Sequence, residues 1–100
     1  MYFRLYFKPD RRPHPKRIFD IVNVEFEDMP VDISPEKFLI QLFRQSGKLT
    51  LEFVYARPSI DGSYRIITHH EPKDYLASDL ETIQECDIGF VHMTSRRSNE

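Results

Sequence analysis

Residues 2–8 alternate between two kinds of position along an extended chain. One side holds Phe3, Leu5 and Phe7, and the other side holds Tyr2, Arg4, Tyr6 and Lys8. A period of two with aromatic residues is typical of a half-buried strand. Prolines at positions 9, 13 and 15 interrupt regular strand pairing, so we expect a stiff loop over 9–16.

The segment 17–27 returns to an extended pattern with apolar residues on both sides. One face holds Ile18, Val22, Val24 and Phe26, and the other holds Phe19 and Ile21. Apolar residues on both sides are typical of a strand that is covered on both faces. We therefore expect 17–27 to form a central strand of a sheet.

Residues 34–47 carry the signals of an amphipathic helix. Ser34 is suited to the N-cap, and Pro35 to the first helical position. The apolar residues Phe38, Leu39, Leu42 and Phe43 recur at helical spacing. Gly47 follows at the position where helices often end in a left-handed residue.

The second half of the chain predicts a hairpin, a short helix and a last strand. Residues 49–56 and 63–70 read as strands joined by a reversal at Asp61-Gly62, and Pro72 marks the end of the second one. Ser78 and Glu81 fit a capping box, and Leu80, Ile83 and Cys86 continue at helical spacing. Residues 87–94 predict the final strand, and the polar tail 95–100 predicts a frayed end.

These elements predict one α+β domain over residues 1–94. The expected architecture is a mostly antiparallel sheet of about five strands with two helices on one face, in the order ββαββαβ. From residue 17 onward this is the split βαβ order of ferredoxin-like folds, preceded by one extra strand. With helices on one side, the other sheet face is expected to be open, and Tyr2, Tyr6, Val54 and Ile67 are candidates to lie there.

Charge is distributed unevenly in a chain whose net charge is only −2. Residues 8–17 hold five of the fourteen Lys and Arg residues, whereas 18–36 holds six acidic residues and no Lys or Arg. The two segments either neutralise each other in the folded chain or form two faces of opposite sign that steer charged partners.

Catalytic and metal-binding patterns are weak. His69, His70, Glu71 and Asp74 cluster in the sequence, but neighbouring strand residues point to opposite faces, so we expect no metal site there. Cys86, the single cysteine, lies on an apolar stripe, which favours a buried role over pairing with His92 as a nucleophile. We accordingly expect no enzyme activity, no metal and no cofactor.

The N-terminal segment offers the clearest candidate binding surface. Aromatic and basic residues share one face of the first predicted strand, and the basic loop follows directly; together the candidates are Tyr2, Arg4, Tyr6, Lys8, Arg11, Arg12, Lys16 and Arg17. Rings can stack on bases while cations meet phosphates. A stiff, charged loop also loses little entropy on docking to a protein.

We therefore expect a small non-enzymatic binding module that regulates or inhibits a larger protein or complex. The alternative is a single-stranded nucleic-acid-binding domain that uses the N-terminal strand and the basic loop. A protein partner is the main expectation, with a homodimer through the open face as a further one. No stretch is long and apolar enough for a membrane span, and the single cysteine favours the reducing cytoplasm.

Overall fold

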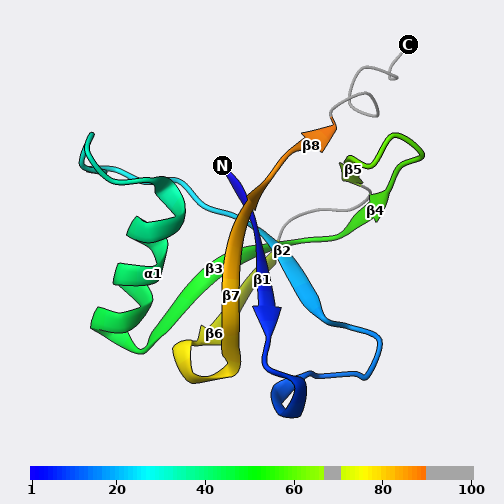
Figure 1. Cartoon of the computed structure of the whole chain (residues 1–100), viewed down its shortest axis with the longest axis horizontal. Helices are drawn as coiled ribbons and strands as arrows, with labels where there is room; N and C mark the ends of the chain where they lie inside the picture. Colours follow the sequence, from blue (N-terminus) through cyan, green and yellow to red (C-terminus); the bar gives the residue numbers. More distant parts are fainter. Residues whose placement is uncertain (67–70, 90–100) are drawn as a thin grey trace.

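A five-stranded antiparallel sheet with strand order β6-β3-β2-β1-β7 forms the frame of the molecule (Figure 1). The computed structural model describes residues 1–66 and 71–89. The strands of this main sheet are β1 (Tyr2–Phe7), β2 (Phe19–Asn23), β3 (Lys48–Val54), β6 (Glu71–Leu76) and β7 (Leu80–Cys86). The predicted α+β class and the central position of the second strand are confirmed.

The helix α1 (Pro35–Ser46) lies across one face of the main sheet (Figure 1). Ser34 accepts a hydrogen bond from the Lys37 N–H at 3.2 Å, as expected of an N-cap. Gly47 ends the helix with φ of 76°, a left-handed conformation that glycine adopts without a steric penalty. Both ends of this helix are therefore set by the residues that the sequence indicated.

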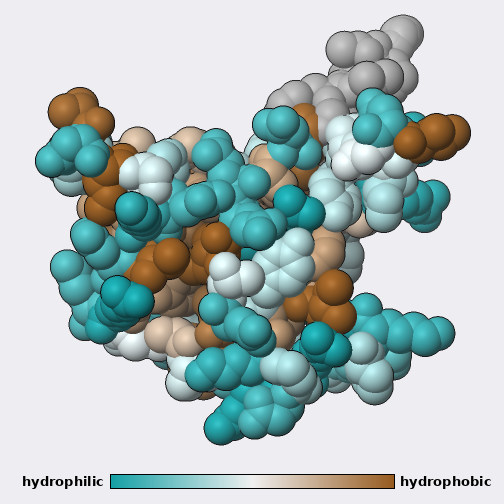
Figure 2. Space-filling view, in the orientation of Figure 1, coloured by the Kyte–Doolittle hydropathy of each residue, from teal (hydrophilic) through white to brown (hydrophobic). Residues whose placement is uncertain are grey.

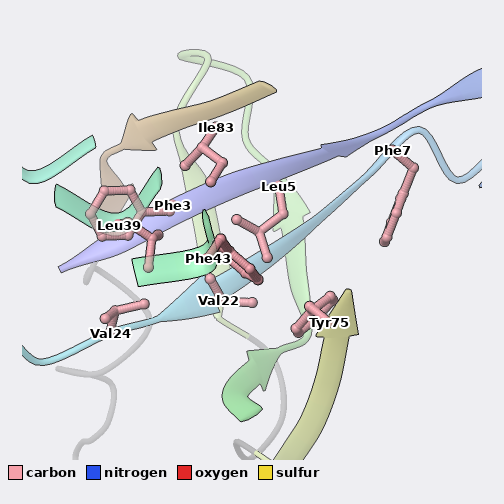
Figure 3. Packing of buried hydrophobic residues seen from close by; sticks show 9 residues of the cluster. All are labelled: Phe3, Leu5, Phe7, Val22, Val24, Leu39, Phe43, Tyr75 and Ile83. Atoms are coloured by element: carbon pink, nitrogen blue, oxygen red, sulfur yellow. The ribbon is translucent and has the colours of Figure 1, made fainter. Parts of the chain in front are cut away.

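The main core lies between α1 and the sheet (Figure 3). Its nine buried residues are Phe3, Leu5, Phe7, Val22, Val24, Leu39, Phe43, Tyr75 and Ile83. Phe3, Leu5 and Leu39 are fully buried. The odd-numbered residues of β1 thus face the helix, as their alternation predicted.

A small second sheet covers part of the opposite face. It has the order β4-β5-β8 and consists of β4 (Ala56–Pro58), β5 (Tyr64–Ile66) and β8 (Ile88–Gly89). Ile88 of this small sheet packs on Ile21 and Val54 of the main sheet, and all three are buried. The expectation of an open face was therefore wrong for Val54, which is 2% exposed, while Ile67 lies outside the described residues.

The prediction of a second helix was wrong. Residues 80–86 form the strand β7 instead, and Ser78 lies in the short 3-10 turn η2 (Ala77–Asp79). The register between β1 and β7 shifts between Tyr6 and Phe7, because Tyr6 pairs with Thr82 and Phe7 with Leu80. This bulge brings Leu80 and Ile83, three residues apart, to the same core, which reproduces helical spacing within a strand.

The ferredoxin-like strand order was wrong for a related reason. Residues 71–76 form β6, which pairs with β3 at the edge of the main sheet. Pro72, which was expected to end the hairpin, is part of this strand, and an edge strand tolerates a residue without an N–H. The hairpin itself forms from β4 and β5 around a turn at Gly62, with φ of 89°, so it is shorter than predicted.

Candidate functional site

Asp20 is a buried carboxylate near the start of β2. Its side chain is 1% exposed, and it points to the same face as the neighbouring Leu5 of β1. Arg17 donates to it from Nε and Nη2 at 2.6 and 2.8 Å. The Lys73 Nζ and the Tyr75 hydroxyl, both from β6, donate at 3.1 and 2.8 Å. These donors compensate for the loss of hydration and tie the end of the basic loop to β2 and β6.

The cations of this cluster also pack on an aromatic ring. The Arg17 Cζ lies 5.1 Å and the Lys73 Nζ 4.9 Å from the centroid of the Phe53 ring. The hydrogen bond to Asp20 raises the pKa of Arg17, and burial together with the nearby Asp20 charge raises the pKa of Tyr75. Arg17 is therefore engaged in structure, and the Tyr75 hydroxyl remains a hydrogen-bond donor at neutral pH.

The ladder between β2 and β3 covers the end of β2 at Asn23 but does not reach its first residue, Phe19. Its last pair is Ile21 with Val54, because the chain then leaves the main sheet for β4. Ile18 and Val24 hydrogen-bond toward β1, so the alternating residues Phe19 and Ile21 direct their N–H and C=O groups toward β3. Within residues 1–66 and 71–89, no strand or loop pairs with the backbone of Phe19 on that side.

A cleft of about 580 Å³ occupies the space where β2 and the β3–β4 segment separate. His14, Lys16 and Arg17 line it from the basic loop, and Phe53, Tyr55 and Tyr64 supply aromatic walls. Figure 2 shows a hollow at the right of the molecule between two projecting parts, with apolar surface inside it. The arrangement combines cations and rings with the Phe19 backbone, which no described residue pairs with on the β3 side.

Two large apolar side chains at this cleft are exposed to solvent. Ile18 is 41% exposed and Tyr55 is 43% exposed, although both line the cleft. The Tyr55 ring lies 4.6 Å from that of Phe53, and its hydroxyl contacts a Glu71 carboxylate oxygen at 3.4 Å. Exposed apolar groups beside cations are typical of a surface that binds a partner.

The candidate residues of β1 lie on the sheet face opposite α1. Tyr2, Arg4 and Tyr6 alternate there as predicted, and all three are half-buried. The Arg4 Cζ lies about 6 Å from three ring centroids, those of Tyr6, Phe19 and Tyr64. This face is therefore packed against the small sheet rather than displayed as a flat platform.

The remaining candidates belong to the basic loop. Lys8, Arg12 and Lys16 are exposed, whereas the Arg11 Nε lies 3.9 Å from Asp10 and 4.0 Å from Asp79. The loop is held by a backbone hydrogen bond of 3.0 Å from the Phe7 N–H to Ile18. In Figure 1 this loop lies at the bottom, and the acidic segment before α1 lies at the upper left. Asp20 of the acidic segment binds Arg17 of the basic segment, whereas the acidic residues between β2 and α1 lie away from the loop.

The predicted metal-like cluster is only partly described, because His69 and His70 lie outside the described residues, as does His92. Glu71 and Asp74 lie on opposite faces of β6, since they are three residues apart in a strand. Asp74 contacts Lys48 and Thr50. Among residues 1–66 and 71–89, no group of three metal-ligating side chains comes together.

Cys86 packs against the small apolar cluster on the face away from α1. Burial raises the pKa of the Cys86 thiol to about 11, and the nearby Arg4 acts in the opposite direction. The thiol is therefore protonated at neutral pH, which is unfavourable for nucleophilic attack.

By its fold and surface, the chain is a small α+β protein with a cleft, lined by basic and aromatic residues, beside its central strand. A comparison with known protein families, curated proteins and solved structures found no match for this chain. Over the part of the chain that the structure describes, no helix has the length and apolarity needed to cross a membrane.

Sequence reasoning missed Asp20 and the cleft. Asp20 shares its strand face with Val22 and Val24, so the alternation had already placed a carboxylate toward the core. That position is a signal for buried partners, because an isolated charge is costly to bury. The sequence holds no comparable signal for the cleft, because the cleft forms where β2 and β3 separate, and a local pattern does not show that point.

Proposed function

We propose that this chain is a non-enzymatic binding module that regulates or inhibits a larger protein or complex. The observation that carries the proposal is the cleft beside β2, where exposed apolar groups and loop cations meet the Phe19 backbone, which no described residue pairs with on the β3 side. Protein interfaces combine such apolar anchors with a polar rim. The single cysteine fits the cytoplasmic location that we propose with it.

Binding of single-stranded nucleic acid is a second proposal, and the cleft favours it by one feature. Phe53, Tyr55 and Tyr64 offer rings close to His14 and Lys16. Such a combination suits stacked bases and a phosphate backbone. The net charge of −2 and the half-buried state of Tyr2, Arg4 and Tyr6 weigh toward the protein partner.

Affinity capture from a native lysate, with and without nuclease, tests the proposal. The bait is the wild-type chain, compared with a double variant at the cleft, Lys16→Glu with Ile18→Ser. The control is Lys37→Glu, which makes the same charge change on α1. We expect capture that survives nuclease, is lost in the double variant and is kept in the control.

Two results would overturn the protein-binding proposal. Capture that disappears with nuclease would favour nucleic acid instead. Equal capture by the wild type and the double variant would show that the cleft is not the docking surface. Light scattering of the purified chain tests the accompanying proposal of a homodimer. A monomer mass that stays constant over a wide concentration range would contradict that proposal.

A further inference from the structure

We propose that the cleft binds an extended segment of a partner protein in which acidic and apolar residues alternate, and that this segment adds a short antiparallel strand to β2 at Phe19. The inference rests on the proposed protein-binding function and specifies the chemistry of the partner. The first step rests on the Phe19 backbone, which no described residue pairs with on the β3 side. A residue placed opposite it would form two hydrogen bonds, one to its N–H and one to its C=O.

The side chains of such a strand must divide between two different environments. In an antiparallel pair, directly opposite residues share a face, so the partner residue opposite Phe19 points to the face that holds Phe19, Ile21 and Tyr64. That environment is aromatic and apolar. The partner residue at this position is therefore apolar.

The neighbouring residues of the partner strand point to the other face. There Arg17 reaches over to Asp20, and its side chain is still 35% exposed. Lys16 and His14 line the same cleft from the loop. Carboxylates at alternate positions complement the charges of Lys16 and Arg17, and they also disfavour binding of the segment in a shifted register.

The probe is a fluorescein-labelled hexapeptide of alternating Glu and Phe, titrated with the full chain and followed by fluorescence anisotropy. Peptides of alternating Lys and Phe, and of alternating Glu and Ser, are the matched controls for charge and for the apolar anchor. We expect measurable binding of the Glu–Phe peptide and at least roughly tenfold weaker binding of each control, as the loss of a charged or anchoring contact implies.

Backbone methylation of the peptide tests strand addition itself. Methylation of the Phe nitrogens removes the N–H that would bond to β2, whereas methylation of the Glu nitrogens affects groups that point away. We expect roughly tenfold weaker binding for the first peptide, and little change for the second. Equal effects of the two modifications would contradict strand pairing.

Two measurements on the protein locate the bound peptide. The amide signal of Phe19 should shift in heteronuclear NMR spectra, and Lys16→Glu should weaken binding while Lys37→Glu should not. Shifts confined to α1 or β7, or no binding of the Glu–Phe peptide at all, would overturn the inference. Tighter binding of an oligothymidine at the same residues would overturn it in favour of nucleic acid.

The outcomes separate this inference from the proposed function. If the lysate partner is captured through Lys16 and Ile18 but the Glu–Phe peptide does not bind, the protein-binding function stands and the strand-addition inference fails. If the peptide binds at Phe19 but no protein is captured after nuclease treatment, strand addition at this cleft stands as a property of the chain, and the proposed protein-binding function fails.

Discussion

Nine buried residues, two of them from α1, form one cluster between the helix and the main sheet, whereas the cluster on the opposite face has three, one of them from the small sheet. The first face also contains Asp20 with all its donors. The second face ends at a cleft where β2 and β3 separate, and Asp20 and Phe53 of the first face also line this cleft. The difference indicates that one face supplies most of the stability, so that the other can leave backbone and apolar groups available for a partner.

The largest effect is expected for Asp20→Ala. This change leaves Arg17, Lys73 and Tyr75 without their shared acceptor, and the loss of one member of a buried charged cluster costs about 4 kcal/mol. Urea denaturation measures the change in the free energy of unfolding.

Asp74→Ala is the matched control for that experiment. Asp74 is 59% exposed and lies 3.8 Å from Lys48, so its loss should cost under about 1 kcal/mol. Similar costs for the two variants would show that the Asp20 cluster contributes no more than a surface ion pair.

A direct comparison of the two faces comes from Leu39→Ala and Ile88→Ala. Leu39 is fully buried among large neighbours, so a cavity there should cost about 3 kcal/mol. Ile88 belongs to the smaller cluster, which can relax more readily, and should cost about 2 kcal/mol. A larger loss for Ile88 in thermal or chemical denaturation would reverse the assignment of stability to the helix side.

Cys86 reports on the packing of the second face. Its pKa of about 11, against an ordinary 9.0, predicts alkylation by iodoacetamide at about pH 8 that is roughly a hundredfold slower than for the same chain unfolded in urea. Because the pKa is raised on folding, the stabilising contribution of the protonated thiol is complete below pH 9 and is lost as the pH rises to about 11. Equal rates in the folded and unfolded chain would show that this cluster is open to solvent.

The elements that the sequence predicted correctly depend on local patterns. β1 follows from strict alternation, and α1 follows from Ser34, Pro35 and Gly47 together with its apolar spacing. These signals are complete within a dozen residues, so they survive in the folded chain.

The elements that were predicted wrongly depend on contacts between distant segments. In the strand 80–86, Leu80 and Ile83 reach the same core three residues apart because a bulge opposite β1 shifts the register, whereas Cys86 lies on the other face. No strand was predicted over residues 71–76, because Pro72 was expected to end the strand 63–70, although an edge position beside β3 makes a strand possible. Similarly, the candidates Tyr2, Arg4 and Tyr6 were placed on the right face, but their partial burial depends on the small sheet.

The smallest effect on stability is expected for the exposed cations of the loop. Replacing Lys8, Arg12 and Lys16 with Ser should cost under about 1 kcal/mol each, because exposed charges contribute little. Arg17→Ser alone should cost more than these three changes combined, since Asp20 loses two hydrogen bonds. The urea midpoints of the triple Ser variant and of Arg17→Ser are compared. A larger loss of stability in the triple variant would contradict the assignment of Arg17 to the structure and of the other three cations to the exposed surface.

Amide hydrogen exchange at β2 tests the central claim most directly. This claim is that β2 pairs with β3 from Ile21 to Asn23 and not at Phe19. The account predicts slow exchange for the amide of Ile21, which pairs with Val54, and for Val22, which pairs with Phe3. It predicts exchange faster by orders of magnitude for Phe19, and slower exchange there once the Glu–Phe peptide is bound. Equal protection of Phe19 and Ile21 in the free chain would show that this backbone is already paired, and would contradict the account.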